Sequence, residues 1–364
     1  MTRRLRRNGE RRVSSDRRSR PRTGRWAWRA TLLAPAFLTL FPHRWHPLEI
    51  LALLAPQIAL CLLLLSVIVI LVRRRVGAEL LVAGALLLGV AAFFAEANRA
   101  TRDMPGDRLR VVLYNAQGNE SPGGAAFDDW LIAQDPDLVC LIDPPSAYLK
   151  LSSQIAARYP HRVEPEPGKW WGIILLSRHP LAPSPLAPLS NEVRHSFIVR
   201  RSVLVNLPSG SRFLFTGSHP PSPRTSETLR DALAQAQLDG LQLQSFRERT
   251  ALPIVVVGDF NSTPTGAAHR MFRRSSGLQA WAPLFGAGTW PSWAPPSIGV
   301  AIDRVWTSQD VGIQRFEVGP RFRSDHRPVL IELTIPFSES PEPQPAKQGT
   351  GEPGSFLSIE DDEP

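Results

Sequence analysis

Eight polar residues that can bind metals or move protons stand beside short apolar stretches of the chain. Carboxylate and amide oxygens suit a hard cation such as Mg²⁺, and a histidine held by an aspartate can take a proton from water. A second histidine or an asparagine can stabilise the negative charge that develops on a phosphoryl group. The set therefore contains what metal-assisted phosphoester hydrolysis requires. Its members are Asn115, Asp143, His219, Asp259, Asn261, Asp303, Asp325 and His326.

The stretch VVVGDFNSTP, residues 255–264, allows two interpretations of its polar residues. Gly, Asp, Asn, Ser and Pro all favour turns, so Asp259 and Asn261 can simply form a turn. Alternatively, the apolar run is a buried strand and the two residues belong to a site, because α/β sheets place their chemistry beyond the carboxyl ends of strands. The rest of the chain has to decide between the two.

Short apolar segments predict the strands that must position these residues, and residues 225–249, which lack proline, predict one long helix. Short strands with few helices favour packed sheets with helices outside. The predicted strands lie in LRVVLYNAQGN, DPDLVCLID, WGIILLSRHPL, SRFLFTGSHPPSP, LPIVVVGDFN, VAIDRVWTS and SDHRPVLIEL.

The order of these motifs resembles the endonuclease/exonuclease/phosphatase superfamily, whose fold is similar to that of deoxyribonuclease I. The resemblance covers about residues 108–333, and GDFNSTP is its most specific part. It implies an α/β fold, a four-layer α/β sandwich with two central β-sheets flanked by helices. The other segments that resemble the family are YNAQGN, GIILLSRHPL, GSHPPSP, IDRVWTS and SDHRPVLIEL.

The resemblance also implies a role for each residue, with Mg²⁺ as the cofactor and Mn²⁺ as an alternative. His326 resembles the general base, and Asp303 the residue that orients it. Asn115 and Asp325 match the metal site. The list is completed by Asp259 and Asn261, which would position the nucleophile and the scissile phosphate, and by His219, which would bind a phosphate oxygen or assist the leaving group.

One position departs from the family pattern. The family places a metal-binding glutamate after its second strand, but the chain reads LVCLIDPPSAY, so Asp143 stands there. Aspartate keeps the carboxylate and is one methylene shorter. Asp143 is therefore the expected third metal ligand. Because it replaces the glutamate, an alternative remains in which the domain binds a phosphate ligand without hydrolysing it.

The positive charge of the chain is concentrated at its amino end. The net charge is +9, and residues 1–29 contain 12 arginines against two acidic residues. The remainder is therefore close to neutral, whereas a duplex-binding surface carries its own basic cluster. We expect a disordered arm that contacts anionic lipid, with a nucleic-acid tail as the alternative.

Apolar runs after the arm predict membrane spans. Ile50–Val72 and Val76–Ala95 are long enough to cross a bilayer, and Ala30–Phe41 is a weaker third candidate. With three spans, the arm and the turn Arg73–Arg75 share one side, which the positive-inside rule makes cytoplasmic. The catalytic domain then lies outside the cytoplasm. Two spans would instead leave the domain in the cytoplasm.

Four regions are therefore expected. Residues 1–25 form a disordered Arg-rich cytoplasmic arm, and 26–97 a transmembrane region of two or three helices. Residues 101–335 form the catalytic domain, and 336–364 a disordered acidic, Pro-rich tail. This layout is similar to membrane-anchored bacterial members of the superfamily that are associated with teicoplanin resistance.

The substrate is expected to be a phosphorylated molecule close to the membrane lipid bilayer. A lipid-linked or envelope phosphate is favoured, with DNA or RNA as the alternative, and no feature indicates a protein partner. Trp170, Trp171, Trp290 and Trp293 either offer amphipathic surface for such a substrate or pack in the interior. Arg194, Arg200 and Arg201 can either bind a phosphate or form a solvated strand edge.

Overall fold

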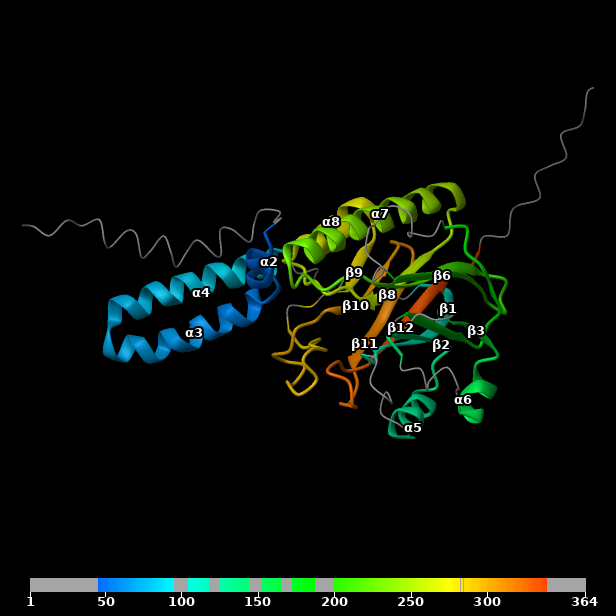
Figure 1. Ribbon diagram of the computed structural model, residues 1–364, viewed down its shortest axis with the longest axis horizontal. Helices are drawn as coiled ribbons and strands as arrows, with labels where there is room; N and C mark the ends of the chain where they lie inside the picture. The colour runs from blue at the N-terminus through cyan, green and yellow to red at the C-terminus, as the bar shows by residue number, and fades with distance from the viewer. Residues whose placement is uncertain are drawn as a thin grey trace, which may run out of the picture.

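The structure, a computed structural model, describes residues 45–94, 104–117, 125–144, 152–164, 172–186 and 199–338, except 282 and 284. The predicted arm, the candidate span Ala30–Phe41 and nearly all of the predicted tail lie outside these residues. Figure 1 shows a sandwich of strands and helices from which a pair of long helices extends to one side.

Within the described residues, each of the two sheets has six strands. The first has the order β11-β12-β1-β2-β4-β3, and the second β5-β6-β7-β8-β10-β9. The first sheet contains β1 (Gly106–Asn115), β2 (Leu138–Ile142), β3 (His161–Val163), β4 (Ile173–Ser177), β11 (Gly312–Val318) and β12 (Val329–Pro336). The second contains β5 (Leu181–Pro183), β6 (Val199–Asn206), β7 (Arg212–His219), β8 (Ile254–Asp259), β9 (Gln279–Trp281) and β10 (Asp303–Thr307).

The central strands are buried on both faces, and their sequences explain why. β2, β4, β8 and β10 have no exposed residue, and the run IVVV of β8 consists of β-branched residues that fit a pleated surface. Val111, Phe215 and Val305 belong to the core between the two sheets. One apolar core therefore joins the sheets face to face.

Helices cover the outer face of each sheet. α7 (Ser226–Thr250) and α8 (Ala267–Ser276) pack on the second sheet through Leu243 and Phe272, and α5 (Ala125–Gln134) and α6 (Ser153–Arg158) pack on the first through Phe127 and Ile155. This helix–sheet–sheet–helix arrangement confirms the predicted four-layer α/β sandwich (Figure 1). The predicted long helix is α7, whose amino end is closed by a capping box from Thr225.

The sequence did not predict five of the strands. Four of them, β3, β5, β9 and β11, are the edge strands of the two sheets. Edge strands bury little apolar surface, so the pattern that identifies a strand is weak there. In addition, the segment predicted as one strand, WGIILLSRHPL, contains β4 of the first sheet and ends at Leu181, the first residue of β5 in the second sheet.

The register of the strands brings the candidate residues to one edge of the sandwich. β7 and β8 are parallel, with Ser218 opposite Gly258, so the following residues His219 and Asp259 end together. β10 is antiparallel to β8 and begins at Asp303, opposite Asp259. In the first sheet β1 and β2 are parallel with Asn115 opposite Ile142, directly before Asp143. β12, antiparallel to β1, starts just after His326.

Among the residues that the structure describes, three helices precede the sandwich. They are α2 (His46–Leu53), α3 (Ala55–Val72) and α4 (Arg74–Phe94). Ala55–Val72 and Arg74–Phe93 are long and apolar enough to cross a membrane. α3 and α4 pack through the small residues Ala55, Ala59 and Ala91, a feature that allows close approach of membrane helices.

The first predicted span starts too early. The run Ile50–Val72 is divided at Leu54, just before Pro56, which has no backbone N–H to donate to a preceding turn. Ile50–Leu53 belongs to α2, and the backbone carbonyls of Ala52 and Leu53 accept hydrogen bonds from side chains of the sandwich. The candidate span therefore begins at Ala55.

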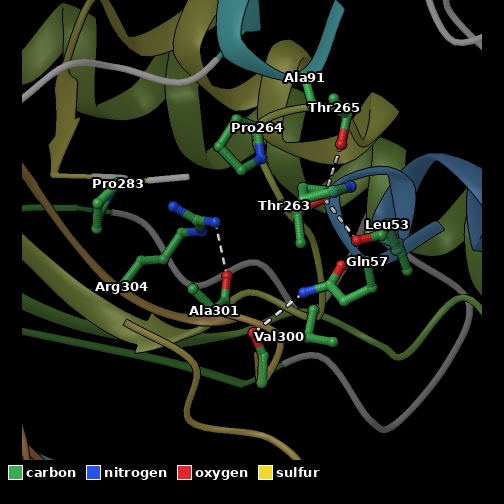
Figure 2. Close-up of a pocket in the computed structure, with 12 residues that line it drawn as sticks. Leu53, Gln57, Ala91, Thr263, Pro264, Thr265, Pro283, Val300, Ala301 and Arg304 are labelled. Atoms are coloured by element: carbon green, nitrogen blue, oxygen red, sulfur yellow. Dashed lines mark hydrogen bonds between the residues drawn. The ribbon is translucent and has the colours of Figure 1, made fainter. Parts of the chain in front are cut away.

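Polar contacts fix α2, which leads directly into α3, to the sandwich. Both carboxylate oxygens of Glu49 accept the backbone N–H of Ala267, the first residue of α8, at 2.8 and 2.9 Å. The hydroxyl of Thr265 donates to Ala52, and that of Thr263 to Leu53. Figure 2 shows Thr263 and Leu53 beside a small cavity of this junction. These contacts involve the residues that directly follow GDFNS, so the helices dock close to the candidate site.

Candidate active site

One oxygen of Asp259 lies at the centre of the candidate site. Its Oδ2 accepts a hydrogen bond from Nδ2 of Asn115 at 2.9 Å. The Nε2 atoms of His219 and His326 lie 3.6 and 3.7 Å from the same oxygen. The carboxyl end of β8 in one sheet therefore meets the end of β1 in the other, with a histidine on either side.

His326 is held by a buried aspartate. Its Nδ1 donates to Oδ2 of Asp303 at 2.7 Å, and both side chains are buried. This bond leaves Nε2 to face Asp259 and Asp325, at 3.7 and 3.8 Å. Burial lowers the pKa of His326, but the charges of Asp303, Asp259 and Asp325 outweigh burial and raise this pKa to about 10.

His219 forms a second histidine–carboxylate pair close to Asp259. Its Nδ1 lies 3.4 Å from Oδ2 of Asp143, whose Oδ1 accepts the backbone N–H of Gly172. Burial opposes protonation of the imidazole, but Asp143 and Asp259 prevail and raise the pKa of His219. Asp143 has φ 44°, a left-handed conformation that few residues other than glycine adopt. The aspartate is thus aimed at His219.

Asp325 lies at the more exposed rim of the site. Its Oδ2 accepts the indole N–H of Trp290 at 3.0 Å, and its backbone carbonyl accepts the N–H of Ser292 at 2.6 Å. The neighbouring Ser324 donates its hydroxyl to the backbone carbonyl of Asn115 at 2.7 Å. These bonds join the segment before β12 to the end of β1 and to the segment around Trp290.

The two interpretations of GDFNSTP both describe part of the structure. Oδ1 of Asp259 accepts the backbone N–H of Asn261 at 2.9 Å, which is a turn, while Oδ2 is the central oxygen of the site. Asn261 has φ 46° and donates Nδ2 to the carbonyl of Pro220. Gly258 is required here, because a Cβ on it would lie 1.9 Å from the backbone oxygen of Ser218. The turn therefore holds the site.

The residues present fit a divalent cation. One donor atom from each of Asp259, Asp303 and His326 lies within 4.8 Å of the others. Among the described residues, Oδ1 of Asp303 and Oδ1 of Asp325 accept no hydrogen bond. Buried carboxylate oxygens without a donor carry uncompensated negative charge, which a hard cation neutralises.

The predicted metal ligands surround this group of three residues. Asn115 is bonded to Asp259, Asp325 lies beside His326, and Asp143 pairs with His219. All eight predicted residues thus lie around one edge of the sandwich, and Asn115, His219, Asn261 and His326 contact Asp259 directly. Asp143 is linked to it through His219, and Asp325 through His326. The eighth, Asp303, is linked through His326.

Sequence reasoning missed the residues that hold the site from behind. Trp290 was noted only for its aromatic surface, and Thr289, Ser292 and Ser324 were not noted. Thr289 accepts the N–H of Asp303 at 3.5 Å and its carbonyl accepts that of Arg327. The motif GTWPSW lies more than 30 residues before SDH, and no local pattern shows that the two segments meet.

The remaining aromatic and basic candidates have different surroundings in the structure. Trp290 and Trp293 are exposed, whereas Trp170, Trp171 and Arg194 lie outside the described residues. Arg200 matches neither prediction, because it forms a buried ion pair with Asp239 at 2.8 Å and donates to Gln242. It is a structural residue on the outer face of the second sheet.

The fold and sequence have known counterparts. The model of the Endonuclease/Exonuclease/phosphatase family matches residues 112–326, more than half of the chain. No curated protein is similar enough in sequence to count as a match.

Solved structures share the fold at low sequence identity. An endonuclease/exonuclease/phosphatase from Beutenbergia cavernae DSM 12333 is 20% identical, with a TM-score of 0.50 over 63% of this chain and 72% of that one. The human Nocturnin catalytic domain is 18% identical, with a TM-score of 0.50 over 63% and 94%. Truncated Caenorhabditis elegans TDP2 is 15% identical, with a TM-score of 0.51 over 64% and 100%. The chain belongs to the endonuclease/exonuclease/phosphatase family and is a metal-dependent hydrolase of phosphoester bonds.

Proposed function

We propose that the protein is a membrane-anchored, Mg²⁺-dependent phosphoesterase that hydrolyses a lipid-linked or envelope phosphate ester or pyrophosphate. The observation that carries this proposal is the docking of α2, which leads directly into α3, beside the GDFNSTP turn through Glu49, Thr263 and Thr265. If α3 and α4 cross the bilayer, the active site stays within a short, fixed distance of lipid headgroups.

The site residues carry the proposed reaction as follows. Nε2 of His326 takes a proton from the attacking water, and Asp303 holds the imidazole in the required tautomer through Nδ1. Asp259 and Asn261 orient the water and the scissile phosphate. His219, backed by Asp143, donates a hydrogen bond to a phosphate oxygen or to the leaving group.

The cation would be held by Asn115, Asp325 and the carboxylate of Asp143, with Mn²⁺ as a substitute for Mg²⁺. When bound, it would neutralise charge that develops on the phosphoryl oxygen. His326 must be neutral to act as a base, and a nearby positive charge would favour this form by opposing the carboxylates that raise the pKa of His326.

Charge and topology support a lipid-linked substrate over a nucleic acid. Outside residues 1–29 the chain is close to neutral, whereas nonspecific binding of nucleic acid depends on a cluster of Lys and Arg. We further propose that the catalytic domain lies outside the cytoplasm, as the arginines of the arm and of residues 73–75 favour with three spans. An extracytoplasmic nuclease is the second candidate, because the family acts on phosphoester substrates such as nucleic acids.

The test is hydrolysis by the purified full chain in detergent, with and without Mg²⁺. A polyprenyl pyrophosphate, a phospholipid and plasmid DNA are compared at equal phosphate concentration, and His326→Ala is the blank. Release of phosphate from the lipid that requires both Mg²⁺ and His326 supports the proposal. Turnover of DNA alone favours the nuclease, and cation binding without turnover of any substrate identifies a binding domain.

A further inference from the structure

We propose that residues 285–298, here called the insertion loop, enter the interfacial layer of the bilayer that α3 and α4 cross and hold the active site against it. The inference rests on the proposed membrane anchoring. It adds a second point of attachment, made by the catalytic domain itself, to the attachment that the two helices provide.

Exposed apolar side chains concentrate in this loop. Within the described part of the sandwich, from residue 104 onward, six large apolar residues are exposed, and four of them lie in the loop. Trp293 is the most exposed of these at 70%, followed by Ile298 at 46%. Phe285 and Trp290 are the other two. A cluster of this kind on an otherwise polar surface marks a site of association.

The loop has no charged side chain to keep it in water. No Asp, Glu, Lys or Arg occurs between Arg274 and Asp303. Inserting an uncharged loop avoids the large cost of removing ions from water. Tryptophan is also the residue that favours the membrane–water boundary, because its ring is apolar and its N–H is polar. This composition fits a lipid interface better than the charged rim of a typical protein–protein interface.

The candidate span α3 fixes where the loop lies. Nε2 of Gln57, in the first turn of α3, donates to the carbonyl of Gly299 at 3.1 Å and to that of Ile298 at 3.4 Å. Figure 2 shows Gln57 reaching this segment from α3. Because α3 becomes a candidate span at Ala55, the end of the loop lies at the depth where the chain enters the bilayer.

The other end of the loop is fixed to the active site. Trp290 donates to Asp325, and the hydroxyl of Ser292 donates to the carbonyl of Ser324 at 2.8 Å. In Figure 1 this gold segment lies at the side of the sandwich that faces α3 and α4, while the end of β12 lies at the far side. The loop is therefore a short, braced connection between the site and the membrane surface.

The first experiment measures whether residue 293 enters lipid. The full chain carrying Cys61→Ser, which leaves only the buried Cys140, receives Trp293→Cys and an NBD label, and is reconstituted into vesicles that contain a spin-labelled lipid quencher. The matched control is Phe337→Cys, because Phe337 is also apolar and exposed, at 54%, but follows β12 at the opposite end of the strands. We expect several-fold stronger quenching and a blue-shifted emission at position 293. Equal quenching at the two positions overturns the proposal.

The second experiment separates lipid contact from chemistry. The double variant Trp293→Ser, Ile298→Ser is compared with the unmodified chain on a lipid phosphate in vesicles and on soluble bis(4-nitrophenyl) phosphate. We expect hydrolysis of the lipid to fall about tenfold, the effect of removing one anchoring aromatic side chain from an interface, with the soluble reaction unchanged. An equal loss on both substrates, or no loss on the lipid, overturns the proposal.

The design distinguishes failure of this inference from failure of the proposed function. If the chain is extracted from vesicles at high pH, or hydrolyses no lipid phosphate, the proposed function is wrong. If the chain resists extraction and hydrolyses the lipid while position 293 remains accessible to a soluble quencher, only the insertion loop is wrong. If a protein partner, and not lipid, covers position 293, the label will not be quenched by the spin-labelled lipid in vesicles that contain no partner. That result also overturns the insertion loop.

Discussion

Two buried ion pairs near the same edge of the sandwich have different surroundings. Arg200 and Asp239 are joined at 2.8 Å, and His326 and Asp303 at 2.7 Å. The free oxygen of Asp239 accepts from Ser218 and Gln235, so the first pair is enclosed by polar partners. In the second pair, Oδ1 of Asp303 accepts no hydrogen bond among the described residues.

The difference shows how a buried charge pair can serve stability or chemistry. Desolvation makes a buried pair costly unless its remaining polar atoms are satisfied, and the pair Arg200–Asp239 meets this condition. The pair His326–Asp303 does not, because Nε2 of His326 lies beyond hydrogen-bond distance from Asp259 and Asp325. The unsatisfied atoms are those that water, a cation and a phosphate would contact.

Breaking the open pair should give the largest effect on activity. Asp303→Asn keeps the shape of the side chain but presents a donor or a neutral acceptor to Nδ1 of His326, which disfavours the required tautomer. We expect the rate of hydrolysis to fall by about 10³- to 10⁴-fold, with little change in thermal unfolding. The measurement is the steady-state rate with a saturating soluble phosphodiester and Mg²⁺.

A double variant tests whether the two residues act as a unit. If they do, Asp303→Asn combined with His326→Ala is no slower than His326→Ala alone, because residues that act together give non-additive losses. Multiplicative losses, or a loss below tenfold in Asp303→Asn, would contradict the role of Asp303 as the orienting residue.

Breaking the closed pair should reduce stability and leave chemistry intact. Asp239→Asn removes the carboxylate that pairs with the buried guanidinium of Arg200, and we expect the free energy of unfolding to fall by about 3 to 5 kcal/mol. Activity per folded molecule should stay within about twofold, since Asp239 contacts no proposed catalytic residue. Chemical unfolding followed by tryptophan fluorescence gives the first quantity, and active-site titration the second.

An exposed ion pair supplies the matched control for this variant. Asp135 pairs with Arg158 and Arg178 at the surface, with half of its side chain exposed. We expect Asp135→Asn to cost less than about 1 kcal/mol, as is usual for surface pairs. If both variants lose the same free energy of unfolding, burial does not make the ion pair of Asp239 more important for stability than a surface pair.

Restoring the family residue should produce a smaller change at the site. In Asp143→Glu, the carboxylate reaches about one methylene further, so we expect tighter binding of Mg²⁺ by a few-fold, on the scale of one improved ligand contact. The concentration of Mg²⁺ at half-maximal rate is the measurement, and Asp143→Asn is the control that removes the charge. Weaker binding in Asp143→Glu would show that the pair with His219 at 3.4 Å matters more than reach.

The sequence predicted the parts of the site that local patterns encode. Apolar runs that end in Asn115, His219 and Asp259 predicted strands β1, β7 and β8, because residue types and spacing suffice to identify a buried strand with a polar end. Parallel pairing then places those ends at one edge. The family resemblance supplied what patterns alone do not, which is the role of each residue, such as His326 as the general base.

Contacts between distant segments were not predictable in the same way. Trp290 meets Asp325, and Glu49 meets Ala267, across 35 and 218 residues of chain. Hydropathy also assigned Ile50–Leu53 to a membrane span, because it measures apolar content alone. It does not show that α2 ends at carbonyls that accept hydrogen bonds from the hydroxyls of Thr263 and Thr265. Arg200 was misjudged for the same reason, since its partner Asp239 lies on another element.

A third buried carboxylate, Glu49, gives the smallest and most condition-dependent effect. Burial raises its pKa from 4.5 to about 7, against the opposing influence of the Ala267 N–H and of Arg270. The folded state therefore binds the proton more tightly than the unfolded state. The stabilisation this provides is complete below pH 4.5 and is lost as the pH rises through 7.

Glu49→Gln should remove this pH dependence. Glutamine is neutral and still offers one oxygen to the amino end of α8, so we expect it to cost less than about 1 kcal/mol at pH 4.5. Between pH 5 and 8, the melting temperature of the unmodified chain in detergent should fall more steeply than that of the variant. A parallel fall in both melting temperatures would mean that Glu49 is ionised throughout this pH range. Its carboxylate would then be a fixed anionic cap on the first N–H of α8, as constant in charge as the enclosed Asp239. It would not be a titrating contact between the anchor and the active-site turn.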